Sequence, residues 1–180
     1  LLHAEQGLGD TLQFVRYGKQ IRERGGKLIV ECQKALLPLL SRLDWIDQLV
    51  AQGETLPPFM CHVPMLSIPG VLGTNIDNIP GEIPYLTADP DLVEKWRESL
   101  SEIEGCKIGI AWQGNPDFKQ DKFRSIPLSR FSELLDIEGA RFISLQKGFG
   151  EEQIQKLERP ERLMVLENVD TDEGAFMDTA

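Results

Sequence analysis

The stretch EQGLGD, residues 5–10, combines residue types that could take part in chemistry. Gly7 and Gly9 let the backbone turn tightly and keep side chains away from a ligand. Asp10 and Thr11 follow at the expected start of a helix, where the unpaired N–H groups favour an ionised carboxylate. Asp10 could therefore cap the helix, accept a proton from a substrate hydroxyl, or do both.

A second group of candidates is a basic cluster in a loop, QGNPDFKQDKFRS, residues 113–125. Lys119, Lys122 and Arg124 lie there in a 180-residue chain whose formal net charge is -10. That acidity argues against binding to nucleic acid or anionic lipid, so a phosphate-bearing ligand would need such a local cluster. The alternative is a solvated loop that carries charges of both signs.

The elements that would position these residues are indicated by short apolar runs that alternate with helical patterns. Such alternation predicts buried parallel sheets built from βαβ units. One helix is expected from Thr11 to Gly25 and another over residues 36–43. The runs of strand length cover residues 1–4, 27–32, 47–51, 60–63, 107–112, 141–145 and 163–169.

The domain organisation is suggested by a segment rich in proline and glycine, residues 68–84. After it, Asp89 as N-cap and Pro90 at the first helical position predict a connecting helix. We therefore expect an α/β chain with two Rossmann-like units in tandem, residues 1–88 and 89–180, the second truncated. The loop of Asp10 would then lie at the carboxyl edge of a parallel sheet, where such folds bind ligands.

A dinucleotide-dependent oxidoreductase is a weaker interpretation of the same loop. The fingerprint G-x-G-x-x-G lacks its third glycine, because Leu12 follows where a glycine is required. Glu31 could serve as the acid that follows the second strand, but a single acidic residue is weak support.

Longer motifs carry a more specific signal. They occur in the order HAEQGLGDTLQFVRY, PPFMCHVPMLSIPGVLGT, PYL, GIAWQGNPDFKQDKFRSIPLSRFSELL and RFISLQKG. In this order the chain resembles the glycosyltransferase-like domain of bacterial tetratricopeptide-repeat proteins, which is related to glycosyltransferase family 9, the heptosyltransferases. The resemblance implies a GT-B fold, with the acceptor on the first domain and a nucleotide-diphosphate sugar donor on the second.

The resemblance also assigns roles to residues. It makes Asp10 the general base of an inverting, metal-independent transfer, and it places Arg124, before Pro127, on the donor phosphates. Gln146 and Lys147 follow a strand and are expected at the donor edge, with helix capping or solvent exposure as alternatives. The expected donor side comprises Arg124, Lys122, Lys119, Gln146, Lys147 and Gly114, and the expected acceptor side comprises Gly7, Gly9, Thr11, His62 and Ser67.

The chain departs from the family pattern at its end. A further strand and an Asp-Thr/Ser-x-x-x-His turn, which bind pyrophosphate in the family, would follow Ala180, and the chain starts at Leu1 without methionine. We therefore expect a fragment that is nearly inactive alone and that self-associates through uncovered apolar surface. A non-catalytic nucleotide-binding or protein-interaction module attached to tetratricopeptide repeats is the alternative function.

The remaining composition is typical of a cytoplasmic protein without a resident cofactor. Cys32, Cys61 and Cys106 are odd in number and widely spaced, which suits neither a disulfide framework nor a zinc site. We expect them to be buried, reduced thiols. No apolar run has the length of a membrane span, and no metal is expected.

Overall fold

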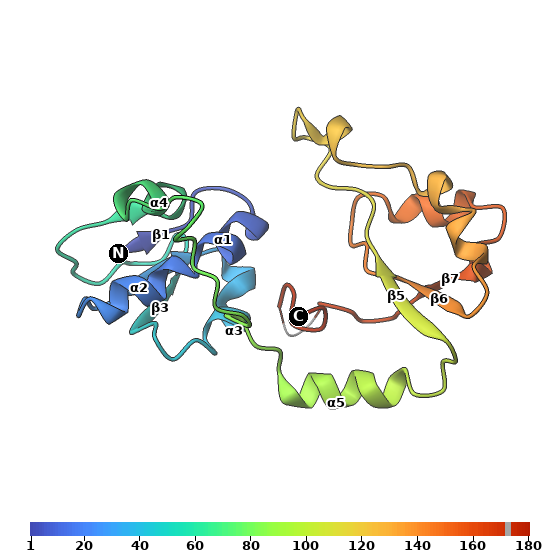
Figure 1. The fold of residues 1–180 in the computed structure, drawn as a ribbon, viewed down its shortest axis with the longest axis horizontal. Coiled ribbons are helices and arrows are strands. Elements are labelled where there is room, and N and C mark those ends of the chain that lie inside the picture. Colours follow the sequence, from blue (N-terminus) through green and yellow to red (C-terminus); the bar gives the residue numbers. More distant parts are fainter. Residues whose placement is uncertain (172–173) are drawn as a thin grey trace. The chain divides into compact units, whose positions relative to one another are not determined.

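The computed structural model describes residues 1–171 and 174–180, and it forms two compact units (Figure 1). The first unit contains residues 1–93 together with the described part of 170–178, and the second contains residues 94–169. Both units are α/β with parallel strands, as the alternation of apolar runs predicts. Such sheets are compatible with Rossmann-like units.

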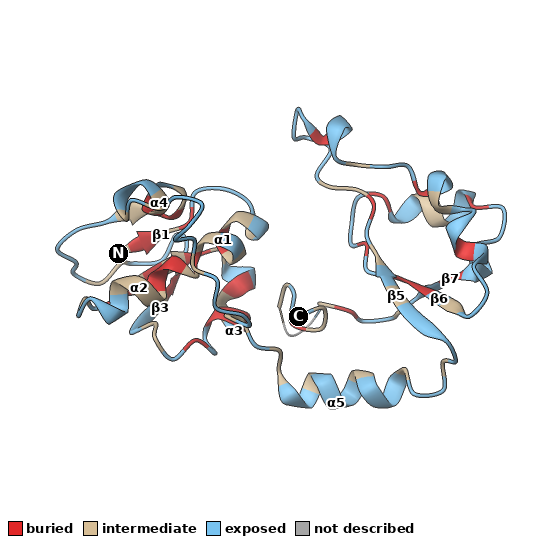
Figure 2. Cartoon of the chain, in the orientation of Figure 1, coloured by how far each residue is buried: buried red, intermediate tan, exposed pale blue. Residues whose placement is uncertain are grey.

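The first unit is built on a four-stranded parallel sheet in the order β3-β2-β1-β4. Leu2 in the central strand pairs with Val30 on one side and with Val63 on the other, so every ladder places apolar side chains next to each other. Leu2 and Val30 have no exposed surface, which puts the core on this sheet (Figure 2). The strands are β1 (Leu2–His3), β2 (Ile29–Cys32), β3 (Gln48–Ala51) and β4 (Val63–Pro64).

The helices of the first unit are short. The single helix expected from Thr11 to Gly25 is two helices, α1 (Leu8–Phe14) and α2 (Tyr17–Glu23). The break between them brings Val15, which has no exposed surface, into the core. The expected helix over residues 36–43 is a 3₁₀ turn followed by α3 (Leu37–Leu40), and α4 (Ile68–Val71) follows β4.

The end of the chain returns to the first unit. The Ala175 N–H donates to the Ala35 carbonyl oxygen at 2.9 Å, and Met177 is buried. Gly174 has φ +112, and a Cβ there would lie 2.9 Å from Pro38 Cγ, so this close approach requires glycine. The sequence had assigned these residues to the second unit. They pack on the first because Ala175 contacts its apolar core.

Helix α5 (Pro90–Ser99) follows the proline-rich segment. Asp89 Oδ1 accepts a hydrogen bond from the Asp91 N–H at 2.9 Å, so the predicted N-cap is confirmed. No residue of α5 is buried, and the ribbon in Figure 2 is largely coloured as exposed along this helix. Among the described residues, no helix is long and apolar enough to cross a membrane.

The second unit contains a three-stranded parallel sheet in the order β5-β6-β7. Its strands are β5 (Cys106–Ile110), β6 (Ala140–Ser144) and β7 (Leu163–Val165). The segments between these strands are mostly loops and 3₁₀ turns, where the sequence predicted a Rossmann-like unit with helices. The buried core of this unit consists of Trp112, Leu128, Leu135, Phe142, Leu157 and Leu163.

Several large apolar side chains of the second unit are in contact with solvent. Phe123 is 80% exposed, Val165 57% and Phe149 53%. Exposed apolar surface of this kind favours association with another surface. Self-association of the chain stays a prediction, and these exposed apolar side chains are the reason for it.

Strands β5 and β6 are each directly preceded by a glycine with positive φ, Gly105 and Gly139. Gly105 has φ +89, and a Cβ there would lie 2.5 Å from the Gly139 carbonyl oxygen, a backbone atom that accepts the Cys106 N–H. We expect Gly105→Ala to destabilise the second unit by about 2–3 kcal/mol, since strain and a steric clash add. Urea unfolding measures this loss of free energy.

The matched control is Gly139→Ala. Gly139 also has positive φ, +76, but a Cβ there would meet no atom within 4 Å. We expect this variant to lose only about 1 kcal/mol, from backbone strain alone. Equal losses in both variants would contradict the steric argument for Gly105.

The three cysteines differ in environment. Cys32 in β2 is fully buried, and its burial raises the pKa of its thiol to about 11. Cys61 and Cys106 are exposed free thiols, so the expectation that all three are buried is wrong. Cys61 lies before β4, outside the buried part of the sheet, and Cys106 begins an exposed strand.

Candidate functional site

Asp10 lies inside the first turn of α1. The helix begins at Leu8, not at Thr11 as the sequence suggested, because Gly7 takes the N-cap position with extended backbone. Asp10 Oδ2 accepts a hydrogen bond from the Gly7 N–H at 3.0 Å. The carboxylate therefore stabilises the turn through one oxygen, while Oδ1 receives no hydrogen bond from the described part of the chain.

The loop of Asp10 is attached to the sheet by amide side chains. Thr11, 1% exposed, donates its hydroxyl to Gln33 Oε1 at 2.9 Å, and Gln33 Nε2 donates to the Gln6 carbonyl oxygen at 2.7 Å. Gln52 Nε2 donates to the Ala4 carbonyl oxygen at 2.8 Å. Thr11 is thus buried and bonded to the protein, so its expected place among the acceptor-side residues is not supported.

Gln33 and Gln52 hold the loop of Asp10 on the sheet through hydrogen bonds, and neither was predicted as a site residue. Each follows directly after a strand, Gln33 after β2 and Gln52 after β3. A polar residue at the carboxyl end of a buried parallel strand lies at the ligand-binding edge of the sheet. That position was the available signal, and it pointed to the loops after residues 1–4, 107–112 and 141–145 but was not applied to those after residues 27–32 and 47–51.

His62 and Ser67, also expected on the acceptor side, lie on opposite edges of the sheet. The strand expected over residues 60–63 begins only at Val63, so His62 precedes β4 and does not follow it, and its Nδ1 lies 3.5 Å from His3 Nε2. Ser67 follows β4 and is exposed in a 3₁₀ turn beside α1. Because the strands are parallel, Ser67 shares the carboxyl edge with Asp10 and His62 does not.

The basic loop after β5 is organised by a buried carboxylate. Asp121 Oδ1 accepts from Arg124 Nε at 2.9 Å, and Oδ2 accepts from the Ser125 hydroxyl at 2.7 Å. Ser125 Oγ accepts the Gly114 N–H at 3.0 Å, which joins the start of the loop to its end. The hydrogen bonds from Ser125 and then Arg124 lower the pKa of the Asp121 carboxyl, so it stays ionised near neutral pH.

The guanidinium of Arg124 is held at Nε, while its side chain remains partly exposed to solvent. The Phe118 ring lies 4.8 Å from Arg124 Cζ, and only Nε is bonded to Asp121. Within the described residues neither Nη atom makes a hydrogen bond, and the side chain is 55% exposed. A Cβ on Gly114 would lie 2.5 Å from Arg124 Nη2, so the guanidinium fits because this residue is glycine.

A hollow of about 310 Å³ opens beside this guanidinium at the carboxyl end of β5. Its position is the ligand-binding edge of a parallel sheet, and it brings together Arg124 and Gly114 of the predicted donor side. The two lysines of the loop are exposed and do not line it, and Lys122 Nζ lies 5.0 Å from the Phe123 ring centre. The lining residues are Ala111, Trp112, Gln113, Gly114, Arg124, Ile126 and Phe131.

Gln146 does not face a ligand. It is 8% exposed, and its Oε1 accepts the N–H groups of Trp112 and Gln113, both at 2.9 Å. Its Nε2 donates to the carbonyl oxygens of Gln113 at 2.8 Å and Phe149 at 2.6 Å. The predicted nucleotide contact is therefore corrected: Gln146 ties the loop after β5 to the loop after β6, and the neighbouring Lys147 is exposed.

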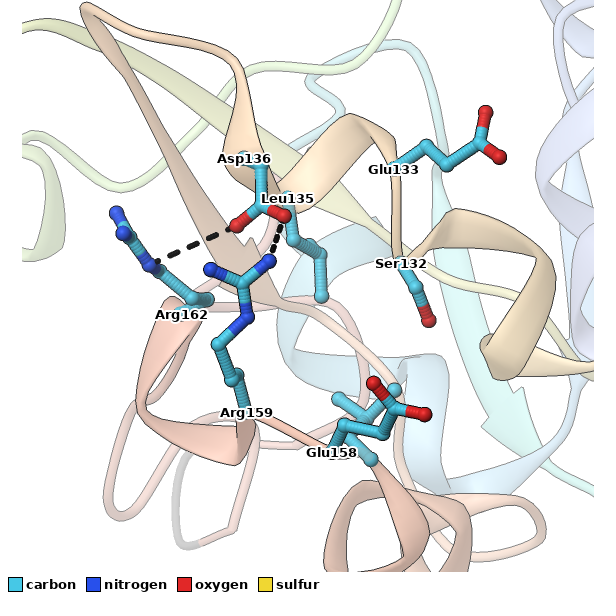
Figure 3. Close-up of a pocket in the computed structure, with 8 residues that line it drawn as sticks. Ser132, Glu133, Leu135, Asp136, Glu158, Arg159 and Arg162 are labelled. Carbon is cyan, nitrogen blue, oxygen red and sulfur yellow. Dashed lines mark hydrogen bonds and ion pairs between the residues drawn. The ribbon is translucent and has the colours of Figure 1, made fainter.

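Another hollow in the second unit, about 220 Å³, is shown in Figure 3. The carboxylate of Asp136 lies between the guanidinium groups of Arg159 and Arg162 and pairs with both. This hollow lies before β6 and β7, at the sheet edge opposite to Arg124. Both arginines pair with Asp136, and Glu133 and Glu158 also line the hollow, so acidic residues outnumber basic ones and make it a poor anion site.

A hollow of about 670 Å³ in the first unit lies between α2 and the segment 78–87. Its cations are already engaged: Arg16 lies 4.0 Å over the Tyr85 ring, and Lys19 pairs with Glu82. Neither Asp10 nor Ser67 lines it. It is therefore separate from the carboxyl edge where the candidate residues gather.

Two further observations bear on the class of protein. No group of three or more His, Cys, Asp or Glu residues within the described ranges could hold a metal ion. No protein-family model, no curated protein and no solved structure matches this chain. The class that the structure defines is therefore an α/β protein with two parallel sheets, each carrying candidate residues at its carboxyl edge.

Proposed function

We propose that the protein transfers a glycosyl group from a nucleotide-diphosphate sugar to an acceptor hydroxyl, with inversion and without a metal ion. The arrangement of Arg124 carries the proposal. Its Nε donates to Asp121, neither Nη atom makes a hydrogen bond with the described residues, and it borders a hollow at the carboxyl end of β5. A guanidinium whose Nη edge is free can bind two phosphate oxygens at once.

The motifs that resemble family 9 glycosyltransferases support the same proposal. Arg124 is the residue that the resemblance places on the donor phosphates, and it lies on the hollow. Gly114 supports it indirectly, because a side chain at this position would displace the guanidinium. Lys119 and Lys122 in the loop after β5, and Lys147 after β6, are exposed. They would contribute through the attraction of their positive charges for the donor phosphates.

Asp10 would act as the general base. In this step the carboxylate removes the proton of the acceptor hydroxyl while the hydroxyl oxygen bonds to the anomeric carbon. The bond from that carbon to the diphosphate oxygen breaks, and the nucleoside diphosphate leaves with the electron pair. Arg124 would stabilise the negative charge on the leaving group, and Asp10 Oδ1 is the oxygen available for the proton.

Nucleotide binding tests the donor side. We expect calorimetric titration with ADP, GDP, UDP and CDP to show binding of at least one of them. Arg124→Gln should weaken that binding by about 10- to 100-fold, since hydrogen bonds between charged groups contribute about 1.5–3 kcal/mol. Arg97→Gln is the control, because Arg97 on α5 is exposed and pairs with Glu94.

Two results would count against the proposal. One is the absence of binding for all four nucleoside diphosphates. The other is an Arg124→Gln variant that binds as tightly as the Arg97→Gln control.

A nucleotide-binding module without catalysis is the second candidate. It is favoured by Thr11, a predicted acceptor-side residue whose hydroxyl donates a hydrogen bond to Gln33 of the protein itself. Binding of a nucleoside diphosphate without cleavage of any of its sugar conjugates would select this candidate over the transferase.

A further inference from the structure

The geometry points to Asp121 as a positioning residue that orients the Arg124 guanidinium for an anion in the hollow at the end of β5. This inference rests on the proposed function, because it concerns how the same site holds a diphosphate. The acidic charge of Asp121 in a basic loop would by itself oppose the binding of an anion, so its role depends on its contact with Arg124.

Asp121 is buried although it belongs to a loop of mostly exposed residues. It is 7% exposed in a loop whose lysines are exposed, and both of its oxygens receive hydrogen bonds. Moving a carboxylate out of water is unfavourable unless it is paired and hydrogen-bonded. The position is thus specified by its partners Arg124 and Ser125, and not by solvent exposure.

Asp121 accepts a hydrogen bond from one particular nitrogen of the Arg124 guanidinium, Nε. A guanidinium can meet an oxyanion along the edge that contains Nε or along the edge formed by both Nη atoms. Asp121 occupies Nε, so the Nη edge is the one left for a ligand. The Phe118 ring, 4.8 Å from Cζ, covers a face of the same group and restricts its rotation.

Asp121 is also connected, through Ser125, to a residue that lines the hollow. Through Ser125, the carboxylate fixes the Gly114 N–H, and Gly114 lines the hollow beside Arg124. A Cβ at Gly114 would lie 2.6 Å from Asp121 Oδ1 as well as 2.5 Å from Arg124 Nη2. Asp121, Arg124 and Gly114 therefore form one arrangement in which a change at any member moves the others.

The experiment is a double-mutant cycle with inorganic pyrophosphate as the probe, on protein expressed from the complete gene. Asp121→Asn keeps the shape of the side chain and removes its charge. If Asp121 acts by orienting Arg124, Asp121→Asn should weaken binding about 10-fold in the wild-type background and very little in an Arg124→Gln background. A purely structural role would weaken binding equally in both backgrounds, and that result would overturn the inference.

A second readout does not depend on binding. The Arg124 Nε–H signal in a ¹⁵N-correlated NMR spectrum should exchange slowly with water in the wild type and rapidly in Asp121→Asn. Ser125→Ala, which leaves the Asp121 to Arg124 bond in place, should keep the slow exchange. Slow exchange that survives in Asp121→Asn would overturn the orienting role.

The two proposals fail in different ways. If wild-type protein does not bind pyrophosphate or any nucleoside diphosphate, the proposed function is overturned and the inference with it. If pyrophosphate binds but the two substitutions are additive, only the role of Asp121 is overturned. Partial recovery of binding in Asp121→Glu would support the need for a carboxylate at this position.

Discussion

Asp10→Asn is expected to lower glycosyl transfer by about 100- to 10,000-fold, the range over which a general base contributes to a rate. Asparagine cannot accept the proton of the acceptor hydroxyl. Its amide oxygen can still accept the Gly7 N–H, so the first turn of α1 should be retained. The assay uses protein expressed from the complete gene and follows release of nucleoside diphosphate from nucleotide-sugars, with water or added sugars as acceptor.

Asp44→Asn is the matched control for this substitution. Asp44 is an exposed aspartate of the same unit, away from the carboxyl edge of the sheet. We expect wild-type rates in this variant and unchanged affinity for nucleoside diphosphate in both variants. Transfer by Asp10→Asn at the wild-type rate would remove Asp10 from the mechanism.

Gln146→Met is expected to destabilise the second unit by about 3–5 kcal/mol. The methionine has a similar length but leaves two N–H groups and two carbonyl oxygens without their partner. A buried polar group without a hydrogen bond costs about 1–3 kcal/mol, and water can reach part of this site, which lowers the sum. Urea unfolding followed by the fluorescence of the buried Trp112 measures the loss.

Gln155→Met separates this effect from the chemistry of the substitution. Gln155 is exposed in the same unit, and no hydrogen bond of its side chain is found among the described residues. We expect its free energy of unfolding to change by less than about 0.5 kcal/mol. A loss in Gln146→Met as small as in this control would mean that solvent replaces all four hydrogen bonds.

The strands were predictable because their signal is local. Ile29–Cys32 and Gln48–Ala51 are short apolar runs, and burial between layers requires such runs in a parallel sheet. The break between α1 and α2 was not predictable, since Val15 and Arg16 carry no helix-breaking signal. Packing of Val15 in the core decides that break, and packing depends on residues far away in the sequence.

The site was predictable in position and less so in the role of each residue. Asp10 and Arg124 both follow strands, and both lie at a carboxyl edge in the structure. The same reasoning also selected Gln146, whose side chain is hydrogen-bonded to backbone groups. It did not select Asp121, which does not directly follow a strand. A polar side chain after a strand can bind a ligand or a neighbouring loop with the same atoms, so only the coordinates distinguish the two.

The return of Ala175 and Met177 to the first unit has a consequence for the order of events during synthesis. The hydrogen bond from Ala175 to Ala35 joins residues that leave the ribosome far apart in time. The second unit, residues 94–169, is synthesised in full before this contact can form. The first unit, whose synthesis begins earlier, is therefore completed only after residues 94–169 have been made, and its nascent form exposes the apolar surface around Ala35 and Pro38 until Ala175 has been synthesised.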